Sequence, residues 1–253
     1  MIKRIAKDEW TGGLAKLAES HCLFGPVKEK AFYNFKALVP GELPDLTLGN
    51  TRLSAKSLVF PQSEAMFTYT LDESKKDHHI LKEVPADDKP RAVLGIRPCD
   101  AKALAMVRMN FDTPEYKDPY WLRLYEATTF VGLACDAPCN TCFCTSTDCG
   151  PYHEEGLDIL LCAEGEGFAA KALTEKGEQL LAAAGWDQEV DLDLDTRKTA
   201  AEGLITSRID TDRLAELDLL DLHGAEFWED VAFACINCGT CTYLCPTCWC
   251  FDI

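Results

Sequence analysis

Four closely spaced cysteines near the C-terminus are the residues of this chain best suited to chemistry. They follow the pattern C-x₂-C-x₂-C-x₃-C-P and are Cys235, Cys238, Cys241 and Cys245. This spacing wraps three thiolates around one corner of a [4Fe–4S] cubane and turns the fourth toward another cluster. Gly239, beside the second cysteine, permits close approach of the backbone. We therefore expect these four cysteines to be iron–sulfur ligands.

The same spacing implies a neighbouring cluster whose ligands are not all within this run. A second run of this kind is expected downstream of Cys245, yet only eight residues follow that cysteine. Either the chain continues beyond Ile253 to a second half of the module, or Cys248 or Cys250 closes one local cluster. A zinc knuckle would instead need two C-x₂-C pairs separated by a dozen or more residues, and no such partner pair is present.

A second group of cysteines lies in the middle of the chain. Cys99 and Cys135 each follow a short apolar run, residues 92–96 and 129–134, that is typical of a buried strand. If these strands are parallel neighbours, their ends lie side by side, where ligand sites gather in α/β sheets. The loop after Cys135 could then fold back. The four-thiolate set predicted in this way is Cys99, Cys135, Cys142 and Cys144.

Several alternatives remain open at this middle site. Cys139 is a fifth candidate ligand, and Asp100 either lends an oxygen ligand or serves as the N-cap of a helix over residues 101–109. Four thiolates also suit a structural zinc ion. The plainest reading is a group of buried free thiols, since cysteine is often buried.

The number and placement of the cysteines favour metal ligation over disulfides. Eleven of the fourteen fall within residues 135–149 and 235–250, whereas a disulfide scaffold is short and spreads its cysteines. The N-terminus lacks a signal-length apolar run, and no stretch approaches a membrane span. We expect a reducing, cytoplasmic location. The net charge of −17 would repel nucleic acid and anionic lipid.

The remaining pattern alternates between strands and helices and predicts an α/β or α+β domain with a mixed sheet. Helices are expected over residues 7–20 and 175–184, and a polar surface stretch over residues 72–88. The expected strands are residues 28–38, 57–60, 64–69, 92–96, 129–134, 157–162 and 168–172. We place this domain at residues 1–225 and the first half of a bacterial ferredoxin-like module at residues 226–253.

Motifs for other chemistry are missing from the sequence. It contains neither a G-x-G-x-x-G fingerprint after a strand nor a G-x-x-x-x-G-K phosphate loop. The five histidines are scattered, and no Ser/His/Asp arrangement can be defended. The pattern therefore favours an electron conductor over a catalyst.

The cysteine motifs and their neighbours also resemble a known family. The segments that carry the resemblance are Phe60-Pro-Gln-Ser-Glu64, Ile96-Arg-Pro-Cys-Asp100, Thr141-Cys-Phe-Cys-Thr-Ser146 with Gly150-Pro151, and Cys241-Thr-Tyr-Leu-Cys-Pro-Thr-Cys248 with Cys250-Phe-Asp252. The chain resembles the iron–sulfur β subunits of cytoplasmic [NiFe] sulfhydrogenases. It is similar as well to the A subunit of anaerobic sulfite reductase and to the iron–sulfur subunit of flavin oxidoreductases that feed heterodisulfide reductase.

The resemblance implies one [4Fe–4S] cluster on the middle cysteines and one or two in the ferredoxin-like module. It implies an anaerobic, cytoplasmic electron-transfer subunit that relays electrons between a flavin- or NAD(P)-binding partner and a catalytic metallo-subunit, with no catalytic residue of its own. Two departures stand out: Trp249 replaces a usual histidine, and Cys149 is an additional thiol.

Two functions from other classes compete with this expectation. In the first, Cys99 is the nucleophile or redox thiol of a cysteine-dependent enzyme. In the second, zinc staples a binding module.

Overall fold

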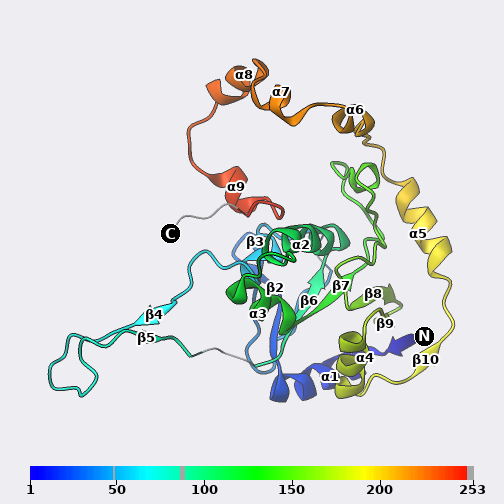
Figure 1. Cartoon of the computed structure of the whole chain (residues 1–253). Helices are drawn as coiled ribbons and strands as arrows, with labels where there is room; N and C mark the ends of the chain where they lie inside the picture. The colour runs from blue at the N-terminus through cyan, green and yellow to red at the C-terminus, as the bar shows by residue number, and fades with distance from the viewer. Residues whose placement is uncertain (48, 86–88, 250–253) are drawn as a thin grey trace.

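An eight-stranded mixed sheet forms the centre of the computed structural model, which describes residues 1–47, 49–85 and 89–249 (Figure 1). Its strand order is β10-β1-β9-β8-β7-β6-β2-β3. The strands are β1 (Ile2–Ile5), β2 (Cys22–Glu29), β3 (Phe32–Ala37), β6 (Arg91–Ile96), β7 (Thr128–Leu133), β8 (Ile159–Glu164), β9 (Gly167–Ala172) and β10 (Glu189–Val190).

The middle of the sheet is parallel and its edges are antiparallel. Strands β2, β6, β7 and β8 run parallel to one another, whereas β3 pairs antiparallel with β2, and β9 with β8. Strands β6 and β7 are buried along almost their whole length, which explains their continuous apolar sequences. The mixed α/β class expected from the sequence is thereby confirmed.

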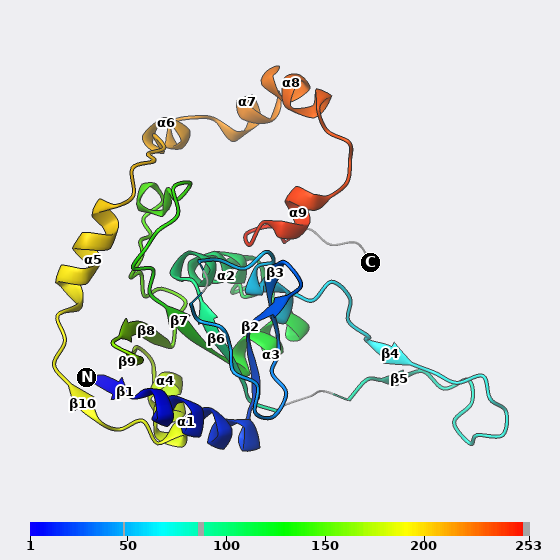
Figure 2. The same ribbon diagram turned by 180° about the vertical axis from the view of Figure 1, so that it is seen from behind.

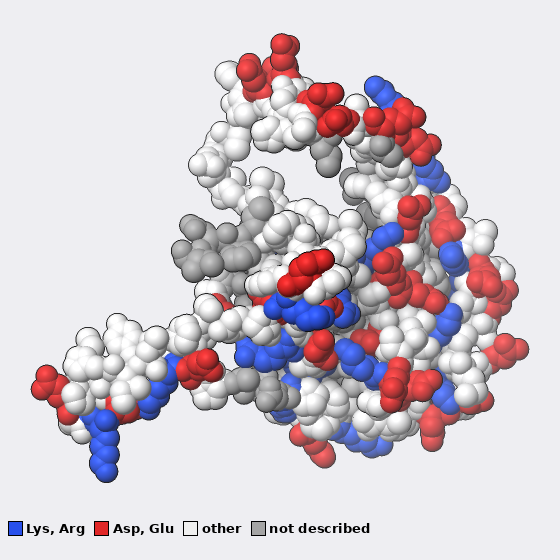
Figure 3. Space-filling view, viewed as in Figure 1, with Lys and Arg blue, Asp and Glu red and all other residues white. Residues whose placement is uncertain are grey.

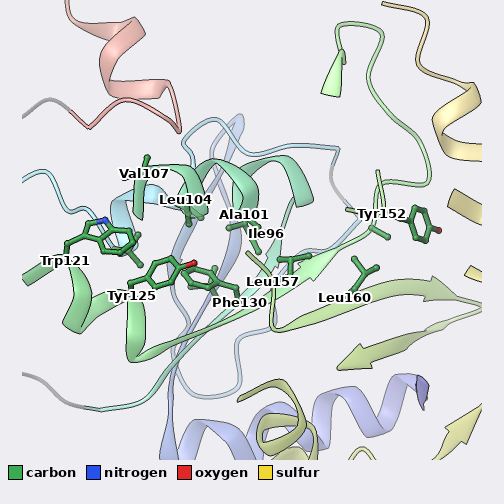
Figure 4. Close-up of a cluster of buried hydrophobic side chains, with 14 of the residues drawn as sticks. Ile96, Ala101, Leu104, Val107, Trp121, Tyr125, Phe130, Tyr152, Leu157 and Leu160 are labelled. Atoms are coloured by element: carbon green, nitrogen blue, oxygen red, sulfur yellow. The ribbon is translucent and has the colours of Figure 1, made fainter. Parts of the chain in front are cut away.

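Helices cover both faces of the sheet (Figures 1 and 2). On one face α1 (Lys7–Ser20) packs against α4 (Glu175–Ala184). Their buried residues include Leu14, Leu17 and Leu181. On the other face lie α2 (Pro98–Phe111) and α3 (Pro119–Glu126). Aromatic side chains of these helices stack in the apolar core on this face (Figure 4), where the ring centroids of Trp121 and Tyr125 are 4.6 Å apart.

Most expected elements appear near their expected bounds. Helices α1 and α4 begin and end as expected, and the expected strands at 92–96, 129–134, 157–162 and 168–172 correspond to β6, β7, β8 and β9. The expected strand at 57–60 is wrong: residues Ala55–Leu58 form a single 3-10 turn, η1, because Ser54 accepts a hydrogen bond from the Lys56 amide and caps that turn. Residues 28–38 divide into the end of β2 and β3, which form a hairpin.

Two segments extend away from this sheet domain. Strands β4 (Phe67–Thr68) and β5 (Lys82–Glu83) form an arm that projects from the body. Beyond β10 the chain forms an arc that returns toward α2 and β3 (Figures 1 and 2). The arc consists of α5 (Leu194–Gly203), α6 (Asp212–Ala215), α7 (Leu219–His223), α8 (Phe227–Phe233) and α9 (Thr240–Leu244).

The surface is acidic over the face seen in Figure 3, where Asp and Glu side chains are scattered over the body and also occur along the arc. This distribution agrees with the excess of 42 acidic over 25 basic residues. Among the described residues, no helix is long and apolar enough to cross a bilayer.

Candidate metal centre

The parallel pairing of β6 and β7 places the first two candidate ligands. The strands pair from Arg91 opposite Thr128 to Leu94 opposite Val131, and after a one-residue register shift Ile96 lies opposite Gly132. Cys99 lies in the first turn of α2, three residues beyond β6, and Cys135 lies two residues beyond β7. Both cysteines therefore lie at the same edge of the sheet, as expected from the sequence, because carboxyl ends of parallel strands meet there.

The loop after β7 folds back and brings more thiols to this edge. Cys99 is close enough to Cys135, Cys144 and Cys149 for their charges to interact. Cys135 interacts in the same way with Cys139, Cys142 and Cys144. The cysteines gathered here, which we call the middle set, are Cys99, Cys135, Cys139, Cys142, Cys144 and Cys149. All four predicted ligands of the middle site are thus among neighbouring thiols.

Backbone hydrogen bonds and a lysine hold this loop in shape. The amide of Cys142 donates to the Cys139 carbonyl (3.0 Å), and the amide of Cys149 donates to the Cys144 carbonyl (3.1 Å). Lys102 on α2 donates through Nζ to the carbonyl oxygens of Thr147 (3.1 Å) and Asp148 (2.7 Å). The loop is therefore attached to the same helix that carries Cys99.

The surroundings of the middle set favour neutral thiols when no metal is bound. Desolvation, together with the negative charge of the neighbouring Asp100 carboxylate, raises the pKa of Cys99 to about 12. Part of Cys99 still reaches solvent. Burial likewise raises the pKa of Cys135, Cys142, Cys144 and Cys149. Ligation must therefore displace protons.

Asp100 does not cap α2. The helix begins at Pro98 with Arg97 as its N-cap residue, so Asp100 lies inside the first turn. The N-cap role and the expected helix start at residue 101 are both wrong. Proline is favoured at the first helical position, so the helix already begins at Pro98. Burial raises the pKa of Asp100 to about 6, opposed by the charge of Arg97. Ligation by its oxygen stays a prediction.

Cys149 is the thiol that the four-ligand prediction omitted. Its charge interacts with both Cys99 and Cys144, so it lies near two of the predicted ligands. The sequence signal was its position directly before Gly150-Pro151. Cys139, the fifth candidate, lies beside Cys142, whose backbone amide donates to the Cys139 carbonyl.

The C-terminal cysteines lie on a loop that curls into α9. Asn237 and Gly239 both have left-handed backbones, with φ of 55° and 69°. Glycine adopts this conformation without cost and asparagine tolerates it better than most residues. These two residues turn the chain around Cys238, and Cys241 follows in the first turn of α9.

Polar groups already contact the sulfur atoms of this segment. The Asn237 amide donates to Cys235 Sγ (3.4 Å), and Thr240 Oγ1 lies 3.2 Å from Cys238 Sγ. The Thr240 hydroxyl is the main cause of a lowered pKa at Cys238. The pKa of Cys245 is lowered too: burial alone would raise it, but hydrogen bonds from Thr247 and the charge of Lys56 outweigh burial.

Of the two additional C-terminal cysteines, Cys248 and Cys250, the structure describes only Cys248. Cys248 is partly buried, and its amide donates to the Cys245 carbonyl (3.3 Å). Cys250 lies outside the described residues. Whether either one ligates a local cluster stays a prediction.

The donor chemistry of two groups of cysteines fits an iron–sulfur cluster. One is the middle set, and the other, which we call the C-terminal set, is Cys235, Cys238, Cys241 and Cys245. Within residues 1–47, 49–85 and 89–249, no three His, Cys, Asp or Glu side chains are placed to hold a single metal ion. A cubane spreads its four thiolates over four iron atoms, so they need not converge as closely as around one ion. Each set offers at least four thiols, the soft ligands that such clusters take.

Helix α2 links the middle set to the C-terminal segment. Cys99 is in its first turn, and Phe111, its last residue, meets Trp249 of the C-terminal segment at a centroid distance of 6.4 Å. The helix rises about 1.5 Å per residue, so the backbones of Cys99 and Phe111 are roughly 18 Å apart. The C-terminal segment therefore meets α2 at the end opposite to Cys99.

Comparison with known proteins confirms the resemblance of the sequence motifs to sulfhydrogenase β subunits. The chain is 27% identical over 253 residues to sulfhydrogenase 2 subunit beta of Pyrococcus furiosus, an alignment that covers 94% of this chain and 69% of that protein. No family model matches the chain, and no solved structure matches it.

Proposed function

We propose that this chain is an electron-transfer subunit of a multi-subunit oxidoreductase. Its relative in P. furiosus is by name a subunit of a sulfhydrogenase, which supports the coarser part of this proposal. In the finer part, the chain relays electrons between a flavin- or NAD(P)-binding subunit and a catalytic subunit of hydrogenase, sulfite reductase or heterodisulfide reductase type. We propose a cytoplasmic location for the complex.

The observation that carries the proposal is that α2 carries Cys99 of the middle set at one end and meets the C-terminal segment at the other. A [4Fe–4S] cluster, when bound, supplies transfer of one electron at a time. Residues 1–225 would hold one cluster through the middle set. Residues 226–253 would act as the first half of a ferredoxin-like module and hold one or two clusters.

Individual residues of the chain have separate tasks in this proposal. Cys99, Cys135, Cys142 and Cys144 are the proposed ligands of the middle site, and either Cys139 or Cys149 could replace one of them. The proposed ligands of the C-terminal site are Cys235, Cys238, Cys241 and Cys245. The buried strands β6 and β7 exclude water beneath the middle set, and the amides and hydroxyls near sulfur adjust the potential.

The competing enzyme function is not supported by the environment of Cys99. A nucleophilic cysteine has a lowered pKa and an adjacent base or cation, whereas the pKa of Cys99 is raised to about 12. No observation on the described residues favours a zinc-stapled binding module over the iron–sulfur reading.

Metal analysis combined with electron paramagnetic resonance (EPR) of the anaerobically purified chain tests the proposal. We expect at least eight iron atoms per chain, since each [4Fe–4S] cluster holds four, and a paramagnetic signal that appears on reduction. Zinc without iron, or no signal on reduction, would contradict it. The partners can be identified from the proteins that copurify with the chain.

A further inference from the structure

The C-terminal cysteine segment, residues 235–249, is attached to the sheet domain at two described points. One is Lys56 in the turn η1, and the other is Phe111 at the end of α2. These anchors belong to one rigid platform, because η1 packs against α2. Ala55, next to Lys56, is fully buried in the same apolar cluster as Phe111.

Lys56 binds the end of α9 through three backbone carbonyls. Its Nζ donates to the carbonyl oxygens of Thr242 (3.1 Å), Cys245 (2.6 Å) and Cys248 (3.2 Å). An ammonium group has three N–H donors, so each carbonyl can take one. Carbonyls in the last turn of a helix lack partners within the helix, and Lys56 supplies partners from a residue 189 positions before Cys245.

The charge of Lys56 is not neutralised by a carboxylate among the described residues. Other lysines pair with acids, as Lys102 does with Glu155 at 3.9 Å, whereas no described Asp or Glu lies within ion-pair distance of Lys56. The Lys56 ammonium group therefore lies beside the backbone of Cys245 without a carboxylate partner among the described residues.

Trp249 provides the second attachment. Its ring meets Phe111 edge-on, at an interplanar angle of 83°, an arrangement that aromatic pairs favour. Phe111 is itself fixed, since it stacks on Trp121 with ring centroids 5.4 Å apart. Lys56 and Trp249 thus hold the segment on both sides of Pro246 and Cys248.

We propose that Lys56 is a positioning residue that clamps the C-terminal cysteine segment to the sheet domain and raises the reduction potential of the cluster held there. The second part rests on the proposed function. Reduction adds an electron to the cluster, and a fixed positive charge nearby stabilises the reduced form. The clamp also fixes the distance between the two thiol sets.

Hydrogen–deuterium exchange of the anaerobically reconstituted chain tests the clamp. The reporting amides are those of Tyr243, Cys245 and Cys248, whose hydrogen bonds lie in the clamped segment. We expect at least tenfold faster exchange at these amides in Lys56→Met and near wild-type exchange in Lys56→Arg. The matched control is Lys76→Met, which removes an exposed lysine from the β4–β5 arm. Unchanged exchange in Lys56→Met would overturn the clamp.

A redox titration followed by EPR tests the charge effect, and loss of one signal in Cys238→Ser identifies the C-terminal cluster. At the wild-type midpoint potential, we expect the ratio of reduced to oxidised cluster to fall at least threefold in Lys56→Met, equivalent to about 28 mV at 59 mV per tenfold. The midpoint potential of the cluster in Lys56→Arg should differ from the wild-type value by less than this shift. Trp249→Ala removes an anchor but no charge. In this variant the backbone amides of the C-terminal cysteine segment should exchange faster, and the reduction potential of the cluster should fall less than in Lys56→Met.

The two failures can be told apart. If Lys56→Met leaves the potential unchanged while a cluster signal is present, the charge effect is wrong. If the wild-type chain gives no cluster signal, the proposed function fails and the charge effect fails with it. The exchange experiment still decides the clamp, because it reads the hydrogen bonds of the protein backbone.

Discussion

At the residue scale, the thiols of the two sets differ in how readily they lose a proton. In the middle set, burial raises the pKa of Cys99 and its neighbours. In the C-terminal segment, hydroxyl groups of Thr240 and Thr247 lower the pKa of Cys238 and Cys245. Since the thiolate is the nucleophile and the metal ligand, the two sets should differ in reactivity when iron is absent.

Alkylation of the iron-free chain should reveal this difference. At pH 8, a thiol of pKa about 12 is ionised to roughly one part in ten thousand, so we expect iodoacetamide to modify Cys99 at least tenfold more slowly than Cys238. Raising the pH toward 12 should speed up modification of Cys99, because the thiolate fraction rises with pH below the pKa. Rates are measured by peptide mass spectrometry. Equal modification rates of Cys99 and Cys238 at pH 8 would contradict the raised pKa of Cys99.

Single replacements should separate the two metal sites. We expect Cys135→Ser to remove about four iron atoms per chain, the content of one cluster. Cys238→Ser should remove iron from the C-terminal site and leave the middle site loaded. Cys22→Ser is the control, since Cys22 lies on β2 away from both sets. Iron content and reduced-state EPR are the measurements. Loss of all iron in either variant would mean that the sites are not independent.

At the scale of elements, α2 joins the two sites, and its packing against the loop before β8 fixes the position of Cys99. Gly156 in that loop has a φ of 81°, and a Cβ atom there would lie 2.4 Å from the Ala101 carbonyl oxygen. The contact leaves no room for a side chain. The close approach of this loop therefore depends on glycine.

Gly156→Ala should lower stability through this contact. A left-handed conformation costs a non-glycine residue about 1–3 kcal/mol, and the backbone clash adds to that cost. We expect the thermal midpoint to fall by at least about 2 °C. Gly12→Ala is the matched control, because that position in α1 has open space and alanine favours helix. A fall of the same size in Gly12→Ala would contradict a specific role for Gly156.

At the scale of the whole molecule, the sheet domain has its own core and the C-terminal segment does not. The sheet domain buries large side chains such as Leu94, Leu104 and Leu160, whereas α8 and α9 contain no buried residue among those described. Phe233, just before residues 235–249, and Ile236, within them, are 94% and 84% exposed. Cluster ligation and the Lys56 clamp should therefore contribute much of the order of the segment.

Removal of the clusters should loosen the segment selectively. After anaerobic chelation, we expect faster hydrogen–deuterium exchange over residues 235–249 and unchanged exchange in β6, β7 and β8. The reason is that metal binding stabilises the folded segment by mass action, while the sheet retains its apolar core. Equal acceleration in the sheet would mean that the chain unfolds as one cooperative unit.

Much of the fold and part of the candidate site could be predicted from the sequence. Periodicity gave α1 and α4 because their apolar faces recur at helical spacing, and the apolar runs gave β6 and β7. The turn η1 and the start of α2 were missed, since Ser54 and Pro98 decide them through local capping geometry. The division into residues 1–225 and 226–253 stays a prediction.

The sequence by itself determined the C-terminal set, because all four of its cysteines lie within one short stretch whose spacing specifies the ligation geometry. Only the tertiary structure decided the rest. The middle set is assembled by the parallel pairing of β6 and β7, which brings Cys135 near Cys99, and by the loop after β7, which brings Cys149 there as well. Lys56 reaches Cys245 across 189 residues. Such contacts join residues distant in the chain, and no local pattern of spacing encodes them.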